Sequence, residues 1–157
     1  KILITCGKLE MPRNDAQEHL RKNIRFEEVE HTADAAFRIY GRDMEELFVN
    51  AGHAVSFLLC ENPSEISGRM GKNVNIEADD AEELLVEWLS ELCFLAETKS
   101  LVFVRFVPEM VKSTRIKAKI YGDKIDRIKT HIKAVTYHNL EIMETETGIA
   151  ATVVFDL

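Results

Sequence analysis

The stretch LLVEWLSELCFLAETKSLVFVRFV, residues 84–107, indicates the fold class, because the spacing of its apolar residues changes halfway along. In its first part they recur at helical spacing, at Leu84, Leu85, Trp88, Leu89, Leu92 and Leu95. After Lys99 the period falls from about 3.6 residues to about 2, and residues 101–107 are predicted to form an apolar strand. Pro108 limits that strand to an edge or an end of a sheet, because proline has no N–H for the ladder.

A first helix is predicted over residues 44–59, with Asp43 as its capping residue and Glu46 three positions on. Its buried face carries Met44, Leu47, Phe48, Ala51, Val55 and Leu58. The same D-x-x-E pattern at Asp79 and Glu82 is expected to start the second helix. The remaining acids of that helix are interpreted as a solvated face that favours the helix dipole, in preference to a paired-carboxylate active site: Asp80, Glu83, Glu87 and Glu91.

The other apolar runs are short and typical of strands. They cover residues 26–30, 35–40, 73–77, 115–121, 131–137, 140–143 and 150–155. ETETG, residues 144–148, is expected to connect the last two as a hairpin. The pattern predicts an α+β two-layer sandwich with two helices packed on one side of a mostly antiparallel sheet. A doubly wound parallel fold would need helices between most strands, and the pattern has none there.

The composition is that of an ordinary globular protein. With 157 residues, 46% hydrophobic and 30% charged, the chain fits one domain at residues 25–157, preceded by an N-terminal extension at 1–24 in which residues 15–24 favour a short helix. No apolar run is long enough to span a membrane, and the opening lacks a secretory signal, so we expect a cytoplasmic protein with no membrane partner. Cys6, Cys60 and Cys93 show no metal or redox spacing, and the last two are expected in the core.

The charge is unevenly distributed. The net charge of −7 argues against a protein that grips nucleic acid over its whole surface. Residues 112–133, however, carry eight basic side chains and only two acids. Within them, Arg115, Lys117 and Lys119 alternate with apolar residues, so they form the basic face of a strand. This candidate docking face would steer association with an acidic partner or with bound RNA.

Two acidic positions are candidates for a cation site. Asp34 follows His31 and Thr32 in a polar loop between two predicted strands, where a structural turn is the alternative explanation. Asp156 stands beside Leu157, after the last apolar run. If the last strand lies beside the strand that begins after Asp34, both carboxylates and the terminal carboxylate of Leu157 would converge. Three hard oxygen donors would suit Ca²⁺, Mg²⁺ or Mn²⁺.

KAVTYH, residues 133–138, is the third stretch whose side chains could take part in binding or catalysis. A buried Lys133 beside carboxylates would be a candidate for an ion pair or for phosphate binding, whereas an exposed one is a strand charge. His138, near a strand end, is interpreted as a hydrogen-bonded structural histidine. No nucleophile motif or catalytic triad is present.

Five stretches in order resemble the archease family: HTAD at 31–34, GRDMEELFVNAGHA at 41–54, ADDAEELLVEWLSELCFL at 78–95, KAVTYH at 133–138 and VVFDL at 153–157. The resemblance covers roughly Phe26 to Leu157. It implies a two-layer α/β sandwich and a non-catalytic accessory protein that promotes guanylylation and turnover of an RtcB-type tRNA-splicing ligase, meeting tRNA only indirectly. It also implies a metal site at Asp34, Asp156 and Leu157, and contact residues for activation at Lys133 and His31.

Two alternatives stay open at this point. The same carboxylates could serve a metal-dependent phosphohydrolase, although no nucleophile or second general base accompanies them. The chain could also be a chaperone-like modulator of RNA-processing proteins that uses no metal.

Overall fold

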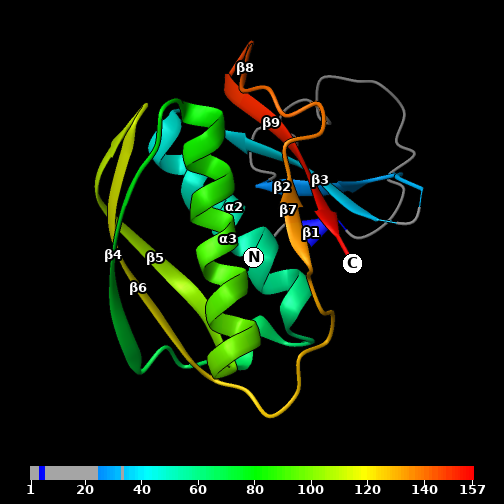
Figure 1. Cartoon of the computed structure of the whole chain (residues 1–157), viewed down its shortest axis with the longest axis vertical. Helices are drawn as coiled ribbons and strands as arrows, with labels where there is room; N and C mark the ends of the chain where they lie inside the picture. Colours follow the sequence, from blue (N-terminus) through cyan, green and yellow to red (C-terminus); the bar gives the residue numbers. More distant parts are fainter. Residues whose placement is uncertain (1–3, 6–24, 33) are drawn as a thin grey trace.

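The computed structural model describes residues 4–5, 25–32 and 34–157 (Figure 1). Its elements, in chain order, are β1 (Ile4–Thr5), β2 (Phe26–Val29), β3 (Ala35–Gly41), α2 (Met44–Leu59), the 3-10 turn η1 (Pro63–Glu65), β4 (Met70–Glu77), α3 (Ala81–Lys99), β5 (Leu101–Lys112), β6 (Arg115–Lys124), β7 (Ala134–Thr136), β8 (Met143–Thr145) and β9 (Gly148–Asp156). The helix expected over residues 15–24 and Cys6 lie outside the described residues.

The strands form two sheets with the two helices between them (Figure 1). One sheet has the order β1-β2-β3-β9-β7, with β8 also paired to β9, and the other has the order β4-β6-β5. Every pair of neighbours is antiparallel except β1 and β2. Helix α2 packs against β3 and β5, and α3 packs against β5 and β7. The α+β class, with two helices on antiparallel strands, is confirmed. The division into two sheets is a tertiary result, because alternation along a strand reveals its faces but not its neighbours.

The helix starts show why one predicted cap was right and the other was wrong by one residue. Asp43 caps α2 as expected, and its carboxylate accepts a 2.9 Å hydrogen bond from the N–H of Glu46. In α3 the cap is Asp80, which accepts from the N–H of Glu83 at 2.8 Å.

The sequence there contains two overlapping D-x-x-E patterns, and distant contacts choose between them. The carboxylate of Glu83 accepts from the N–H of Asp79 at 2.6 Å, while that of Glu82 turns away to the N–H of Ile142 at 3.2 Å. With Glu82 engaged elsewhere, the second pattern makes the reciprocal cap.

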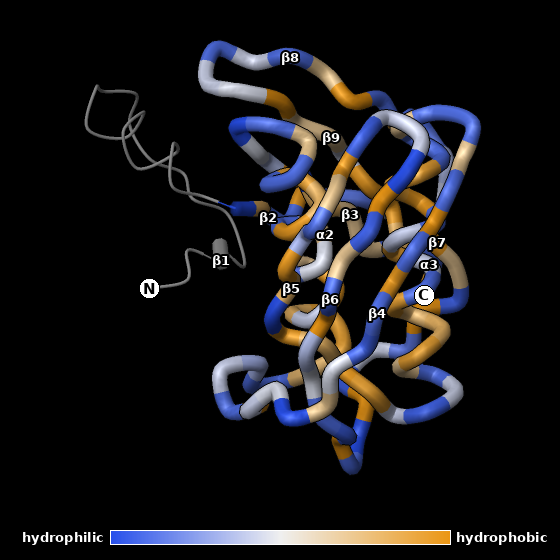
Figure 2. Tube along the Cα trace, turned by 90° about the vertical axis from the view of Figure 1, so that its left-hand side faces the viewer, coloured by the Kyte–Doolittle hydropathy of each residue, from blue (hydrophilic) through white to orange (hydrophobic). Residues whose placement is uncertain are grey.

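Several strand ends differ from the prediction. β5 does not stop near Pro108 but continues to Lys112, with a register shift between Pro108 and Met110. It is an edge strand, as the proline indicated. Residues 131–137 were expected to be extended throughout, yet only Ala134–Thr136 pair as β7. The hairpin between β8 and β9 is confirmed, but its first strand covers Met143–Thr145 and not residues 140–143. Hydrophilic and hydrophobic residues alternate along β4, β5 and β6 (Figure 2).

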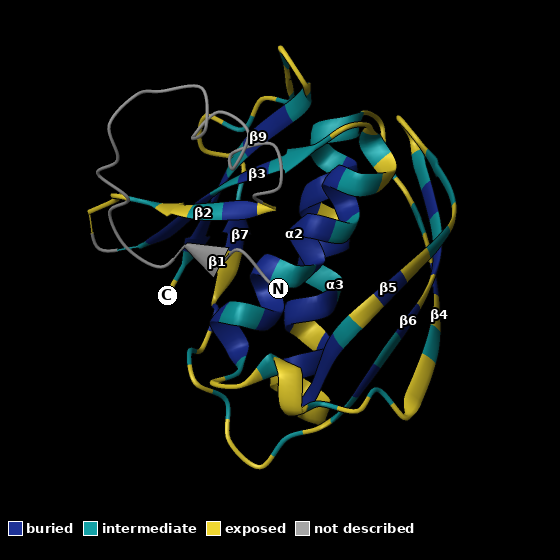
Figure 3. Cartoon of the chain, turned by 180° about the vertical axis from the view of Figure 1, so that it is seen from behind, coloured by how far each residue is buried: buried dark blue, intermediate teal, exposed yellow. Residues whose placement is uncertain are grey.

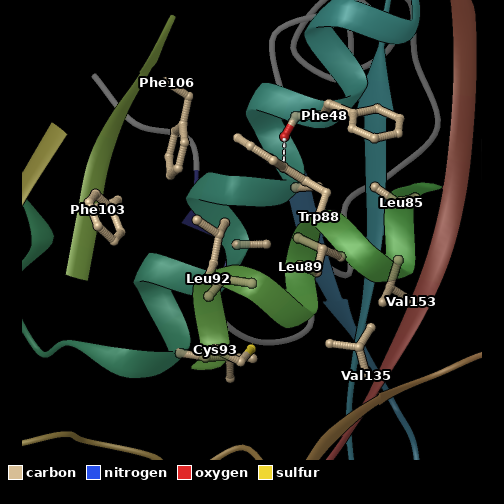
Figure 4. Packing of buried hydrophobic residues seen from close by; sticks show 14 of the residues in the cluster. Phe48, Leu85, Trp88, Leu89, Leu92, Cys93, Phe103, Phe106, Val135 and Val153 are labelled. Carbon is tan, nitrogen blue, oxygen red and sulfur yellow. Dashed lines mark hydrogen bonds between the residues drawn. The ribbon is translucent and has the colours of Figure 1, made fainter. Parts of the chain in front are cut away.

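The core fills the space between the two sheets (Figures 3 and 4). Trp88 of α3 is buried at its centre and donates from Nε1 to the carbonyl oxygen of Phe48 in α2 at 3.0 Å. The ring of Phe106 from β5 stands edge-on to Trp88, with centroids 5.9 Å apart. Cys93 is buried in the same core, and burial raises the pKa of its thiol to about 12. This cysteine is therefore a structural residue, as its apolar helical context predicted.

Candidate functional site

The candidate site lies at one end of the larger sheet, where β3 begins, β9 ends and β7 begins. In the register of β3 and β9, Ala35 pairs with Phe155, and in that of β7 and β9, Ala134 pairs with Asp156. Asp34 comes directly before β3 and Asp156 is the last residue of β9, so the two residues are neighbours at this end of the sheet. We call this place, defined by Asp34 and Asp156, the carboxylate edge. The expectation that the last strand lies beside the strand after Asp34 is confirmed.

Core burial fixes this register. Ala35 is 5% exposed and Phe155 is fully buried, with its ring edge-on to that of Phe37 at 6.1 Å between centroids. A slip of one residue would turn these side chains to the opposite face of the sheet. The alternation that buries Phe155 also sends Asp156 to the other face, where it is only partly buried.

Two histidines border the carboxylate edge. His31 Nδ1 lies 3.6 Å from Asp34 Oδ2, and both side chains are partly exposed. The ring of His138 stands edge-on to that of His31, with centroids 6.3 Å apart. His138 is held by its own loop, since its N–H donates to Thr136 Oγ1 at 3.3 Å and its Nε2 lies 3.2 Å from Asn139 Nδ2. The hydrogen-bonded state expected for His138 is confirmed.

Sequence reasoning did not join His138 to His31. The structure brings them together because Asn139 adopts a left-handed conformation, with φ of 51°, directly after His138. Asparagine tolerates that conformation better than most residues, so the His-Asn pair was the available signal for a turn after β7.

Lys133 also reaches this edge, but through its backbone. Its N–H donates to the carbonyl oxygen of Asp156 at 2.8 Å. Its side chain is exposed, and among the described residues it makes no ion pair. The alternative of a buried, carboxylate-paired lysine is therefore wrong for this conformation. The ammonium group remains accessible to a partner.

The donors at the carboxylate edge are of the type that a hard divalent cation takes as ligands. Asp34 and Asp156 supply carboxylate oxygens from adjacent strands, and Leu157, 37% exposed, follows Asp156 directly. In residues 25–32 and 34–157, no three side chains of His, Cys, Asp or Glu are grouped closely enough to hold a metal ion by themselves. Any cation here would therefore need a main-chain carboxylate, water or a partner to complete its ligands.

The predicted docking face lies elsewhere. Arg115, Lys117 and Lys119 are on β6, in the other sheet and across the helical layer from the carboxylate edge (Figure 1). The expected alternation is confirmed, because Ile116, at 1% exposure, and the fully buried Ile120 point inward. The chain thus has two separate candidate surfaces of opposite charge.

These features define a class: small α+β proteins in which two helices are enclosed by two antiparallel sheets and a pair of aspartates marks one sheet edge. The model of the archease protein family matches residues 26–157. The chain belongs to the archease family.

Individual relatives agree with this assignment. Protein archease of Methanosarcina barkeri is 39% identical over 140 residues, which cover 84% of this chain and 95% of that protein. Protein archease of Pyrococcus abyssi is 34% identical over 131 residues, covering 79% and 92%. The solution structure of Methanobacterium thermoautotrophicum protein 1598 has a TM-score of 0.70 at 31% identity, covering 85% of this chain and 99% of that one.

A crystal structure of an archease from Thermotoga maritima, described as a possible chaperone, shares the fold, with a TM-score of 0.59 at 24% identity. It covers 82% of this chain and 94% of that one. Neither helix of the described residues combines the length and apolarity needed to cross a bilayer.

Proposed function

We propose that this chain is a non-catalytic activator of an RtcB-type tRNA-splicing ligase, which promotes guanylylation and turnover of that enzyme in the cytoplasm. Family membership supports the class of function. The observation that carries the proposal is the strand register that places Asp34 and Asp156 at one exposed edge, beside the backbone of Lys133. In this proposal the protein meets tRNA through the ligase.

The carboxylate edge is the part of the molecule proposed to enter the ligase. Asp34, Asp156 and the main-chain carboxylate of Leu157 would hold a divalent cation, Ca²⁺, Mg²⁺ or Mn²⁺, which when bound would offset their mutual repulsion and supply positive charge next to a nucleotide phosphate. The protein's own residues keep these oxygens in place. Phe155 anchors β9 in the core, and the hydrogen bond from Lys133 ties the segment after β6 to the end of β9.

Lys133 and His31 are proposed as contacts with the ligase. The exposed ammonium of Lys133 can reach an acidic group or a phosphate on the partner, because no carboxylate of the described residues pairs with it. His31 is positioned against Asp34, which orients its ring toward the same edge.

The test is single-turnover guanylylation of the purified ligase with labelled GTP, with and without this protein. We expect Asp156→Ala to abolish the stimulation while leaving the thermal unfolding midpoint nearly unchanged, because the side chain is only partly buried and lies at a strand end. The matched control is Glu61→Gln, which removes an exposed acid two residues after the end of α2 and should leave the stimulation at its full level.

Stimulation by a folded Asp156→Ala protein equal to that of the unaltered protein would refute the proposal. Turnover of a generic phosphoester by the purified protein with Mg²⁺ or Mn²⁺, lost in Asp156→Ala, would instead identify a phosphohydrolase.

A further inference from the structure

The side of the three-stranded sheet that faces away from the helices is a surface separate from the carboxylate edge. We call it the outer sheet face. It comprises the residues paired across β4, β6 and β5 whose side chains alternate outward: Gly71, Asn73, Asn75, Glu77, Arg105, Val107, Met110, Lys112, Arg115, Lys117, Lys119 and Tyr121. Figure 2 looks onto this sheet. Helices α2 and α3 cover only its opposite side, where Phe106, Ile116 and Ile120 are buried.

The outer sheet face is basic within an acidic protein. It carries five cations against three acids, whereas the whole chain has a net charge of −7. The acids are Glu77, the bulge residue Glu109 and, near the end of β6, Asp123, whose carboxylate already accepts hydrogen bonds from residues 67–69. The lysines and arginine of β6 recur at every second residue, so neighbouring cations are about 7 Å apart along the strand. A row of this kind suits a partner that also repeats its negative charge along a line.

Glu77 and Glu109 only partly neutralise this row. Glu77 lies 3.4 Å from Arg115, and Glu109 lies 3.8 Å from Lys119, and all four side chains are at least one third exposed. Such exposed pairs contribute little and exchange readily for other anions. Within the part of the chain that the structure describes, Lys112 and Lys117 make no ion pair at all.

The face also carries a stacked pair of planar side chains, Arg105 over Tyr121. The guanidinium carbon of Arg105 lies 3.8 Å from the centroid of the Tyr121 ring. The ring occupies space over the neighbouring strand, because a Cβ on Gly71 would come within 3.2 Å of Tyr121 Cε1. The exposed amide of Asn73 lies on the next position of β4 that points outward. Planar groups stack on nucleic-acid bases, and amides bond to base edges.

We propose that the outer sheet face binds single-stranded RNA, with the β6 row contacting the phosphates and the Arg105–Tyr121 pair stacking on a base. An acidic protein surface would explain the charges but not the planar pair beside them. The choice of RNA rests on the proposed function, to which this surface adds a direct RNA contact on the opposite sheet from the carboxylate edge.

The test measures fluorescence anisotropy of a labelled single-stranded RNA of about 12 nucleotides with the full chain alone, without ligase and with a metal chelator. Failure of the ligase activation would not affect this readout. We expect affinity to fall as salt rises, and the double variant Lys112→Gln with Lys117→Gln to bind about tenfold more weakly with a shallower salt dependence. Tyr121→Leu should also bind about tenfold more weakly but keep the salt dependence, because stacking is not a counterion effect.

The matched control is Arg42→Gln with Arg127→Gln, which removes the same charge from exposed positions outside the face and should bind as the unaltered protein does. Tyr121→Phe should keep the stacking and the affinity. Binding that is unchanged in the Lys112 and Lys117 variant would overturn the proposal. So would competition by polyglutamate as effective as that by unlabelled RNA at equal charge, which would assign the face to an acidic protein.

Discussion

The backbone N–H of Lys133 and the carbonyl oxygen of Asp156 are joined by a hydrogen bond of 2.8 Å. This bond extends the pairing of β7 and β9 by one step, beyond the partners Ala134 and Asp156. It holds the segment that carries Lys133 against the end of β9, so that the lysine and both aspartates belong to one edge although about 100 residues of chain separate Lys133 from Asp34. The position of the carboxylate edge therefore depends on the hydrogen-bond ladder between β7 and β9.

The first prediction concerns cation binding. Titration calorimetry of the unaltered protein with Mn²⁺ should show binding, and Asp34→Asn and Asp156→Asn should each weaken it by tenfold or more. Removing a ligand should cost at least as much as removing an outer hydrogen-bond partner of a metal site, which typically costs about 10- to 100-fold. Asp126→Asn, an exposed acid in the loop after β6, should leave the isotherm unchanged. Equal isotherms for all four proteins would show that the aspartates do not form a cation site.

The second prediction concerns pH. Burial, assisted by the charge of Arg25, lowers the pKa of His53 to about 4, from an ordinary value near 6.5. Below about pH 6.5 His53 binds a proton in the unfolded chain but stays neutral in the folded chain. The free energy of unfolding therefore falls as the pH drops toward about 4. Between pH 7 and pH 5 the unaltered protein should lose about 2 kcal/mol more than His53→Gln does, measured by urea unfolding.

His131→Gln is the control for that experiment, because its imidazole is exposed beside Glu97. It should keep the additional loss between pH 7 and pH 5. A loss in His53→Gln equal to that of the unaltered protein would contradict the assignment.

The third prediction concerns the contact between α2 and β5. A Cβ at Gly52 would lie 2.8 Å from ring atoms of Phe106, which also packs against His53 and Trp88. Gly52→Ala should therefore destabilise the protein by about 1 kcal/mol, since overpacking exceeds the gain in helix propensity. In a Phe106→Leu background the same change should be neutral or stabilising, and a double-mutant cycle by thermal unfolding measures this coupling. Additive effects in the cycle would argue that the ring does not limit position 52.

The fourth prediction concerns the turn before β4. The carboxylate of Asp123 accepts hydrogen bonds from the hydroxyl of Ser67, at 2.7 Å, and from the backbone N–H groups of Ser67, Gly68 and Arg69, each at 3.0 Å. These bonds, that of the Ser67 hydroxyl first, hold the pKa of Asp123 below its usual value.

Asp123→Ala should thus speed hydrogen exchange of those three amides, whereas Asp126→Ala should not. Because the folded pKa is depressed, the bonds are fully present above the ordinary carboxyl pKa and are lost as pH falls through the lowered one. Protection of the three amides that survives in Asp123→Ala would contradict this account.

The local elements could be read from the sequence because their signals are themselves local. Asp43 and Glu46 mark the start of α2 within four residues, and the alternation from Arg115 onward marks the two faces of β6. The cap of α3 could not be read in this way, since Asp79 and Asp80 offered equivalent patterns until Ile142 engaged Glu82. The same limit applies to β7, which ends at Thr136 where the chain turns toward His31.

The same distinction between local signals and distant contacts applies to the candidate site. Its two aspartates and its lysine could be recognised as polar groups at the ends of apolar runs. The order of the motifs that contain them matched one family. The helices, the inward and outward faces of most strands and the identity of the polar groups could be predicted from the sequence, because periodicity and capping act over a few neighbouring residues. Packing of the whole chain sets three further features: the strands divide into two sheets, β9 lies between β3 and β7, and the carboxylate edge and the outer sheet face lie on opposite sides of the helices. Those choices depend on which strands bury which side chains together, and that is a property of the whole core.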